Sequence, residues 1–96
     1  MAYDPGAIDA TLAAAVGDEP VLIAELRIAF IDSAERALAA IENATDDAGW
    51  AVNAARLKGL AASFGAVRLM ALAADAAKAP GDREHIRKLR RAIERL

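Results

Sequence analysis

Apolar side chains recur with the period of an α-helix between Trp50 and Phe64, and this pattern constrains the fold more than any other feature of the chain. At 100° of rotation per residue, five of these side chains fall within about 80° of one another. They are Trp50, Ala54, Leu57, Ala61 and Phe64. A stripe of this width is typical of a helix that buries one face. We therefore predict a helix from about Asp47 to Phe64, with this stripe in the core.

The opposite side of this helix carries little side-chain bulk. Rotation at the same angle brings four small or short side chains together there, with one long cation at their border. These residues are Val52, Ala55, Gly59 and Ala62, with Lys58 as the cation. Such a face leaves room for another molecule to come close. The spacing of Ala55 and Gly59, taken alone, is more typical of a seam at which a second helix packs closely.

The composition extends the helical prediction to the rest of the chain. Hydrophobic residues make up 56% of the sequence but aromatic residues only 4%, so the core must consist mainly of aliphatic side chains and alanine. Alanine, the strongest helix former, accounts for more than a quarter of the residues, whereas residues that favour strands are few. We therefore expect an all-α fold. A length of 96 residues is typical of one domain, and we assign residues 1–96 to it.

Two helices are expected ahead of the apolar stripe. The first is short and amphipathic, and it ends at Gly17. Its apolar residues are Ile8, Leu12 and Val16. The second runs from Pro20 to about Ala44, with Asp18 as its capping residue and Glu19 as an acid in its first turn. Its expected apolar face consists of Leu22, Leu26, Ala29, Phe30, Ser33, Ala37 and Ile41.

Two further helices are expected after the stripe. Thr45 or Asp46 is the expected N-cap of the stripe helix, and Gly65 fits a left-handed residue that closes it. Residues 66–79 are apolar over a wide arc, which predicts a well-buried helix. Its two apolar sides are Val67, Met70, Ala74 and Ala77, and Leu69, Leu72 and Ala76. The last helix follows Asp82, its N-cap, and its apolar residues are Ile86, Leu89, Ile93 and Leu96.

Four of these five helices are long enough to pack along their lengths, and the loops between them are short. This pattern predicts an antiparallel up-down-up-down four-helix bundle with a short N-terminal helix. Because many unrelated proteins share that architecture, it indicates no function by itself.

The run from Ala54 to Ala66 resembles the signature of histidine-phosphotransfer (HPt) domains. In that signature a histidine is followed by x-Leu-Lys-Gly and, a turn or two later, by a Gly-Ala pair. Here Leu57-Lys58-Gly59 and Gly65-Ala66 match it, whereas Ala55 occupies the position of the phosphoacceptor histidine. The resemblance covers nearly the whole chain and implies a helical bundle as well.

The resemblance also implies a role for particular residues. Lys58, one turn beyond Ala55, would pair with phosphoryl oxygens, and Gly59 would keep the approach open for a partner's catalytic pocket. Ser33 is either a small residue tolerated in its helix, bonded back to a carbonyl group, or a polar side chain near the phosphoacceptor position. The expected partner-binding face consists of Val52, Ala55, Arg56, Lys58, Gly59 and Ala62. A methyl group cannot carry phosphate, so the chain cannot accept a phosphoryl group at position 55.

These features favour a signalling protein of a two-component phosphorelay that docks a response-regulator receiver domain, a sensor histidine kinase, or both. Without the histidine at position 55, the chain is either a pseudo-HPt domain that binds without transfer or an inactivated variant of a transfer protein. It needs no cofactor of its own, because the Mg²⁺ of the reaction would belong to the receiver domain. The alternative function is a helical adaptor or dimerisation module unrelated to phosphorelay.

Other functional classes lack their sequence signals. The chain has no cysteine, no metal-ligand spacing and no nucleophile paired with a base, so we expect no enzyme active site and no metal. His85, the single histidine, is interpreted as an ordinary residue of a first helical turn. No apolar run is long enough to cross a membrane, and we expect a cytoplasmic monomer.

The charges are divided unevenly along the chain. Residues 1–55 carry a formal charge of −8 and residues 56–96 carry +6, and we expect helix packing to neutralise part of this difference. The bases of the last helix follow its solvent side, and few aromatic residues accompany them. They are Arg83, Arg87, Lys88, Arg90, Arg91 and Arg95. With a net charge of −2, this pattern predicts a solvated face and no nucleic-acid partner.

Overall fold

The computed structural model describes residues 5–17 and 19–96, with side chains from Ile8 onward. The described residues form five helices and no strand, which confirms the all-α prediction. The helices are α1 (Pro5–Val16), α2 (Pro20–Glu42), α3 (Asp47–Ser63), α4 (Val67–Ala77) and α5 (Arg83–Glu94). The three residues from Gly17 to Glu19 separate α1 from α2. Asp18, the expected cap of α2, lies outside the described residues, and Glu19 takes the N-cap position without a side-chain cap bond.

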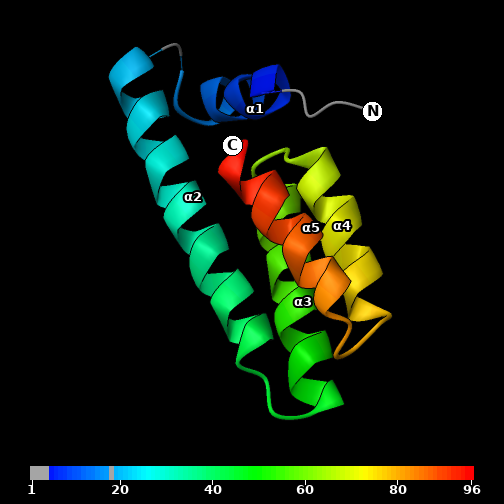
Figure 1. Cartoon of the computed structure of the whole chain (residues 1–96). Helices are drawn as coiled ribbons and strands as arrows, with labels where there is room; N and C mark the ends of the chain where they lie inside the picture. Colours follow the sequence, from blue (N-terminus) through cyan, green and yellow to red (C-terminus); the bar gives the residue numbers. More distant parts are fainter. Residues whose placement is uncertain (1–4, 18) are drawn as a thin grey trace.

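Helices α2 to α5 surround a common core, while α1 packs against α2 near one end of the bundle (Figure 1). Each of these four helices packs against two of the others, because α3 lies between α2 and α4, and α5 closes the ring against α4 and α2. The α2–α3 pair is antiparallel. The rings of Phe30 and Phe64 stack with centroids 4.6 Å apart near one end of the pair, and the Asn53 amide lies 3.5 Å from the Ala40 carbonyl oxygen farther along it.

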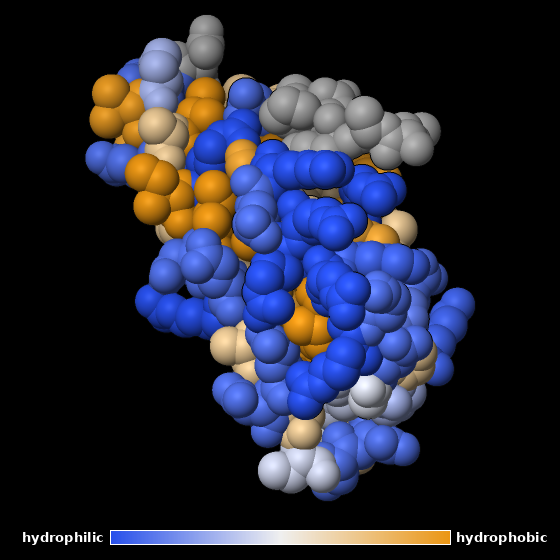
Figure 2. All heavy atoms as spheres, viewed as in Figure 1, coloured by the Kyte–Doolittle hydropathy of each residue, from blue (hydrophilic) through white to orange (hydrophobic). Residues whose placement is uncertain are grey.

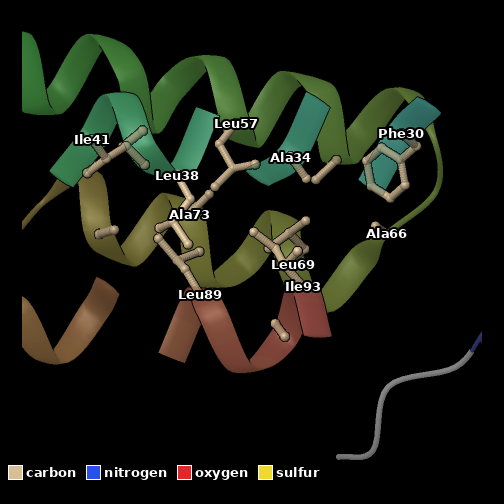
Figure 3. Packing of buried hydrophobic residues seen from close by; sticks show 14 of the residues in the cluster. Phe30, Ala34, Leu38, Ile41, Leu57, Ala66, Leu69, Ala73, Leu89 and Ile93 are labelled. Atoms are coloured by element: carbon tan, nitrogen blue, oxygen red, sulfur yellow. The ribbon is translucent and has the colours of Figure 1, made fainter. Parts of the chain in front are cut away.

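The core consists of aliphatic side chains and alanine, with two aromatic rings. Figure 3 shows Leu38, Leu57, Ala73 and Leu89, from α2, α3, α4 and α5, directed into the shared interior. Alanines are among the most completely buried residues, because small side chains let helix axes approach one another. The Trp50 indole N–H donates a 2.7 Å hydrogen bond to the Ala76 carbonyl oxygen, so burial of this ring leaves its polar atom satisfied.

The apolar stripe of α3 is buried as predicted. Trp50, Ala54, Leu57 and Ala61 are at most 4% exposed, and Phe64, half-buried, packs against the same core. Asp46 decides the open choice of N-cap, because its carboxylate accepts a 2.7 Å hydrogen bond from the Gly49 backbone N–H.

The predicted buried face of α2 is partly wrong. Its buried residues are Phe30, Ala34, Leu38 and Ile41, whereas Leu22 and Ala29 are exposed and Ser33 is half-buried. Because Phe30 stacks on Phe64, the first ten residues of α2 extend beyond the end of α3. In this extension α3 no longer covers α2, and the side chains meet α1 and, at Arg27, the Leu96 carbonyl group, so helical period alone could not tell which of them are covered. The helix also ends at Glu42, two residues earlier than expected.

Helix α4 is shorter and less completely buried than predicted. It spans Val67–Ala77, and its buried residues are Leu69, Ala73 and Ala76. Val67 is 65% exposed, because it opens α4 directly after the turn, on the side away from the core. Helix α5 agrees with the prediction. The Asp82 carboxylate accepts a 3.0 Å hydrogen bond from the Glu84 N–H, and Ile86, Leu89, Ala92 and Ile93 are buried.

The reversal between α3 and α4 depends on Gly65, whose φ is +72°. The Gly65 N–H donates to the Ala62 carbonyl oxygen at 3.2 Å. The Ala66 N–H donates to the Ala61 carbonyl oxygen at 2.9 Å. This pair of bonds is a Schellman motif, which requires a left-handed residue immediately after the helix. Ala61 and Ala66 are both buried, so the turn is also closed by an apolar contact.

We expect Gly65→Ala to lower the free energy of unfolding by about 1–2 kcal/mol, because an L-residue with a side chain is strained in the left-handed region. Urea unfolding followed by the fluorescence of Trp50 would measure the change. An unaltered or increased stability would show that the turn does not depend on this conformation.

Candidate functional site on helix α3

The residues of the predicted partner-binding face lie together on the outer side of α3. Ala55, Arg56, Lys58, Gly59 and Ala62 are exposed, and Val52 has 51% of its surface accessible. They project away from the stripe that packs against α2 and α4. The structure therefore presents one continuous surface of short side chains, bordered by Lys58 on one side and Arg56 on the other.

Gly59 leaves open space at the centre of this face. A Cβ atom built at Gly59 would meet no other atom within 4 Å, so no packing inside the chain requires glycine there. The Ser63 hydroxyl group, one turn on, is held back against α3 by a 3.0 Å hydrogen bond to the Gly59 carbonyl oxygen. The space above Gly59, beside Ala55, is therefore free of other described atoms.

The face carries two cations, Arg56 and Lys58, and no acidic residue. After Asp47, helix α3 contains no acidic residue, and the side chains one turn away from Lys58 are all alanine. Those neighbours are Ala54, Ala55, Ala61 and Ala62. Within the described part of the chain, neither Lys58 nor Arg56 takes part in an ion pair. Both cations are therefore available to an anionic group of another molecule.

The structure does not bring Ser33 beside Ala55. The α2–α3 contacts described above put Ser33 level with about Ala61, on the order of 8 Å along the helix axis from Ala55. Its side chain is half-buried, and its hydroxyl group makes no hydrogen bond to the described residues, so the expected bond to a carbonyl group one turn earlier is absent.

An apolar residue of this region escaped the sequence interpretation. Val67 was placed on a buried side of its helix, yet it is one of the exposed large hydrophobic residues, together with Val52. The tight turn at Gly65 brings it to the same end of the bundle as Ala62. Its exposure could have been predicted from its position two residues after Gly65, because a side chain in the first turn after such a reversal lies at the rim of a bundle.

The opposite surface of the molecule has a different character. Figure 2 shows strongly hydrophilic side chains over α5 and an apolar patch over the N-terminal part of α2, where Val21, Leu22 and Ile28 are exposed. Among the described residues, the expected neutralisation between the two halves of the chain occurs at the Arg90–Glu42 ion pair. His85 lies on α5, which packs against α2 and α4, with its Nε2 atom 3.8 Å from an Asp82 carboxylate oxygen.

Within the described residues, no group of three or more His, Cys, Asp or Glu side chains gathers in a way that could hold a metal ion. None of the helices in the same part of the chain combines the length and the apolarity needed to cross a bilayer.

Comparison with known families decides how this face is interpreted. A family model described as "Hpt domain" matches residues 25–96, from the second turn of α2 to the last residue. The chain belongs to the Hpt domain family. Hpt domains are phosphocarrier modules of phosphorelay signalling that interact with receiver domains and kinases. The matched segment contains all of α3, and α1 lies outside it. Among curated proteins and solved structures, no match was found.

We expect Gly59→Ala to raise the free energy of unfolding by about 0.5–1 kcal/mol, because alanine loses less backbone entropy in a helix and has room here. Urea unfolding would measure this, with Gly65→Ala as the matched control of opposite sign. A loss of stability would show that the open space at Gly59 has been misjudged.

Proposed function

We propose that this Hpt domain docks response-regulator receiver domains on the outer face of α3 and binds them without accepting a phosphoryl group. In this proposal residues 1–96 form a single cytoplasmic domain, α2 to α5 form an antiparallel up-down-up-down bundle, and the sensor histidine kinase is a second possible partner. The domain is then a pseudo-HPt protein that acts by occupying its partner.

One observation carries the proposal. In this member of the Hpt family, the exposed side of α3 has Lys58 and Gly59 one turn beyond Ala55, which occupies the phosphoacceptor position, and no contact among the described residues explains either of them. Lys58 pairs with no anion among the described residues, and Gly59 lowers helix stability without relieving any clash there. Both residues are explained if another protein comes close to this face with an anionic group.

The absence of transfer follows from the side chains around position 55. A methyl group has no lone pair with which to attack phosphorus. The nearest hydroxyl group along α3 belongs to Ser63, two turns and about 12 Å farther along the axis. His85 is on α5, which is not one of the helices packed beside α3.

We expect Ala55→His to restore phosphoryl uptake. An imidazole at position 55 would stand on the exposed face, with the Lys58 ammonium group one turn away to pair with the phosphoryl oxygens. Phosphorylated receiver domains from the same source would serve as donors, and acid-labile label on the domain would be the readout. The unaltered chain should take up no label.

A matched variant separates chemistry from docking. Ala55→His combined with Lys58→Gln should accept the label at least about tenfold more slowly, since one charge-assisted hydrogen bond is lost. If Ala55→His takes up no label although the unaltered chain binds the same receiver, the face is not arranged for phosphoryl transfer. If no receiver of the source organism binds, the proposed docking function is wrong.

We expect Gly59→Leu to weaken receiver binding at least about tenfold, because a large side chain would stand where the partner must approach. Leucine is a good helix former, so the helix itself should persist. Ala39→Leu is the control, because Ala39 is exposed on α2 and lines the groove between α2 and α5. Isothermal titration would compare the two variants, and equal affinities would place the docking surface elsewhere.

A further inference from the structure

An open groove of about 590 Å³ lies between α2 and α5, which run side by side (Figure 1). The apolar side chains that line it are Ile31, Leu38, Ala39, Ile93 and Leu96. Ile28, one turn before Ile31 and 67% exposed, continues this apolar surface toward the N-terminus of α2. No other part of the described chain covers the groove, so its apolar surface is available to another molecule.

The two helices that flank the groove carry opposite charge. Helix α2 contains four acids and two bases, whereas α5 contains two acids and five bases besides its histidine. Both bases of α2 are already engaged, because Arg27 pairs with Asp9 and Arg36 pairs with Asp32. The groove therefore has an acidic helix on one side and a basic helix on the other.

Packing within one copy of the chain neutralises little of this difference. Among the described residues, Glu42 and Arg90 form the ion pair that crosses the groove. The charged side chains of α2 and α5 that form no ion pair with described residues are Glu25, Glu35, Arg83, Lys88, Arg91 and Glu94. A purely basic partner would meet the bases of α5, and a purely acidic partner would meet the acids of α2. The surface is complementary to a partner with the same two helices in exchanged positions.

A second copy of this chain is such a partner in one orientation. Helices α2 and α5 are antiparallel, because Arg27 reaches the Leu96 carbonyl oxygen near one end of the pair and Arg90 reaches Glu42 near the other. A two-fold axis parallel to the helices would place α2 of each copy over α5 of the other, so that acids face bases twice. A two-fold axis across the helices would place α2 on α2 and α5 on α5, with like charges opposed. The charge pattern thus selects the parallel axis.

We propose that the groove between α2 and α5 is the interface of a symmetric dimer of this chain, in which the acids of α2 in each copy lie against the bases of α5 in the other. The apolar groove forms the centre of this interface and the charged side chains form its rim. The monomer expected from the sequence is then the dilute form. Helix α3 packs between α2 and α4, so its outer face stays outside the interface, and the dimer presents two such faces. The dimer does not depend on receiver docking.

Sedimentation velocity of the unaltered chain tests the dimer directly. We expect the mean mass to rise with protein concentration from that of one chain toward that of two. Added salt should shift the equilibrium back toward single chains, because the rim charges that attract one another are exposed and therefore screened. A mass of one chain at every concentration would overturn the inference.

Two charge reversals test which helices meet. Glu35 lines the groove on α2, Arg91 follows the groove residue Arg90 on α5, and both Glu35 and Arg91 are exposed. Glu35→Lys alone, or Arg91→Glu alone, should raise the dissociation constant of the dimer at least about tenfold, because each places like charges opposite one another twice. An equimolar mixture of the two variants should again form dimers, since every reversed acid then faces a reversed base.

Matched controls come from α4, where Asp75 and Arg68 are exposed and form no ion pair with described residues. Asp75→Lys and Arg68→Glu change the net charge by the same amounts and should leave the dimer within about twofold of the unaltered chain. Circular dichroism would confirm equal helix content in all four variants. Controls that weaken the dimer as much as the groove variants, or a mixture that stays monomeric, would overturn the inference.

Receiver binding is a separate readout. Because the outer face of α3 lies outside the interface, the dimer-deficient variants should bind a receiver domain with the affinity of the unaltered chain, and the dimer should bind two. Receiver binding by a chain that never dimerises overturns the dimer alone. Dimers that bind no receiver of the source organism overturn the proposed docking function alone.

Discussion

The close packing of α3 between α2 and α4 is the interaction on which the other features depend. Ala54 and Ala61 are fully buried in this contact, together with Leu57, and such small side chains allow neighbouring helices to approach closely. A larger residue at either alanine would push the helices apart and open cavities around Leu57. Since the stripe fixes the rotation of α3 about its own axis, it also determines which side chains remain outside. The bare face around Ala55 is a geometric consequence of how well the other side is packed.

The predictive power of the sequence differed between helices for a physical reason. In α3 each apolar position has a neighbouring helix to meet, so helical period and burial coincide, and Asp46 and Gly65 mark its ends by their own chemistry. In α2 the same period continues past the end of α3, where no second helix covers the Leu22 side. Period indicates which residues share a face, but only the lengths and offsets of the neighbours decide whether that face is buried.

The candidate site was predictable to the extent that it lies on one helix. Spacing along α3 is sufficient to bring Val52, Ala55 and Gly59 to one side, and the structure places them there. Relations between helices were not predictable in the same way. The distance of Ser33 from Ala55 depends on the offset of α2 against α3. The exposure of Val67 depends on how sharply the chain reverses at the turn before it. Both depend on contacts between segments that are distant in sequence.

Helix α1 stands apart from this arrangement. It packs mainly against α2, and Arg27 connects it to the bundle by pairing with Asp9 while donating a 3.0 Å hydrogen bond to the Leu96 carbonyl oxygen. The family match begins at residue 25, so the segment common to Hpt domains excludes this helix. Ile8 and Leu12 of this helix are nevertheless buried in the core cluster, so loss of α1 would expose part of the apolar interior at that end of the bundle. This end of the apolar core is therefore covered by a segment that the family match does not include.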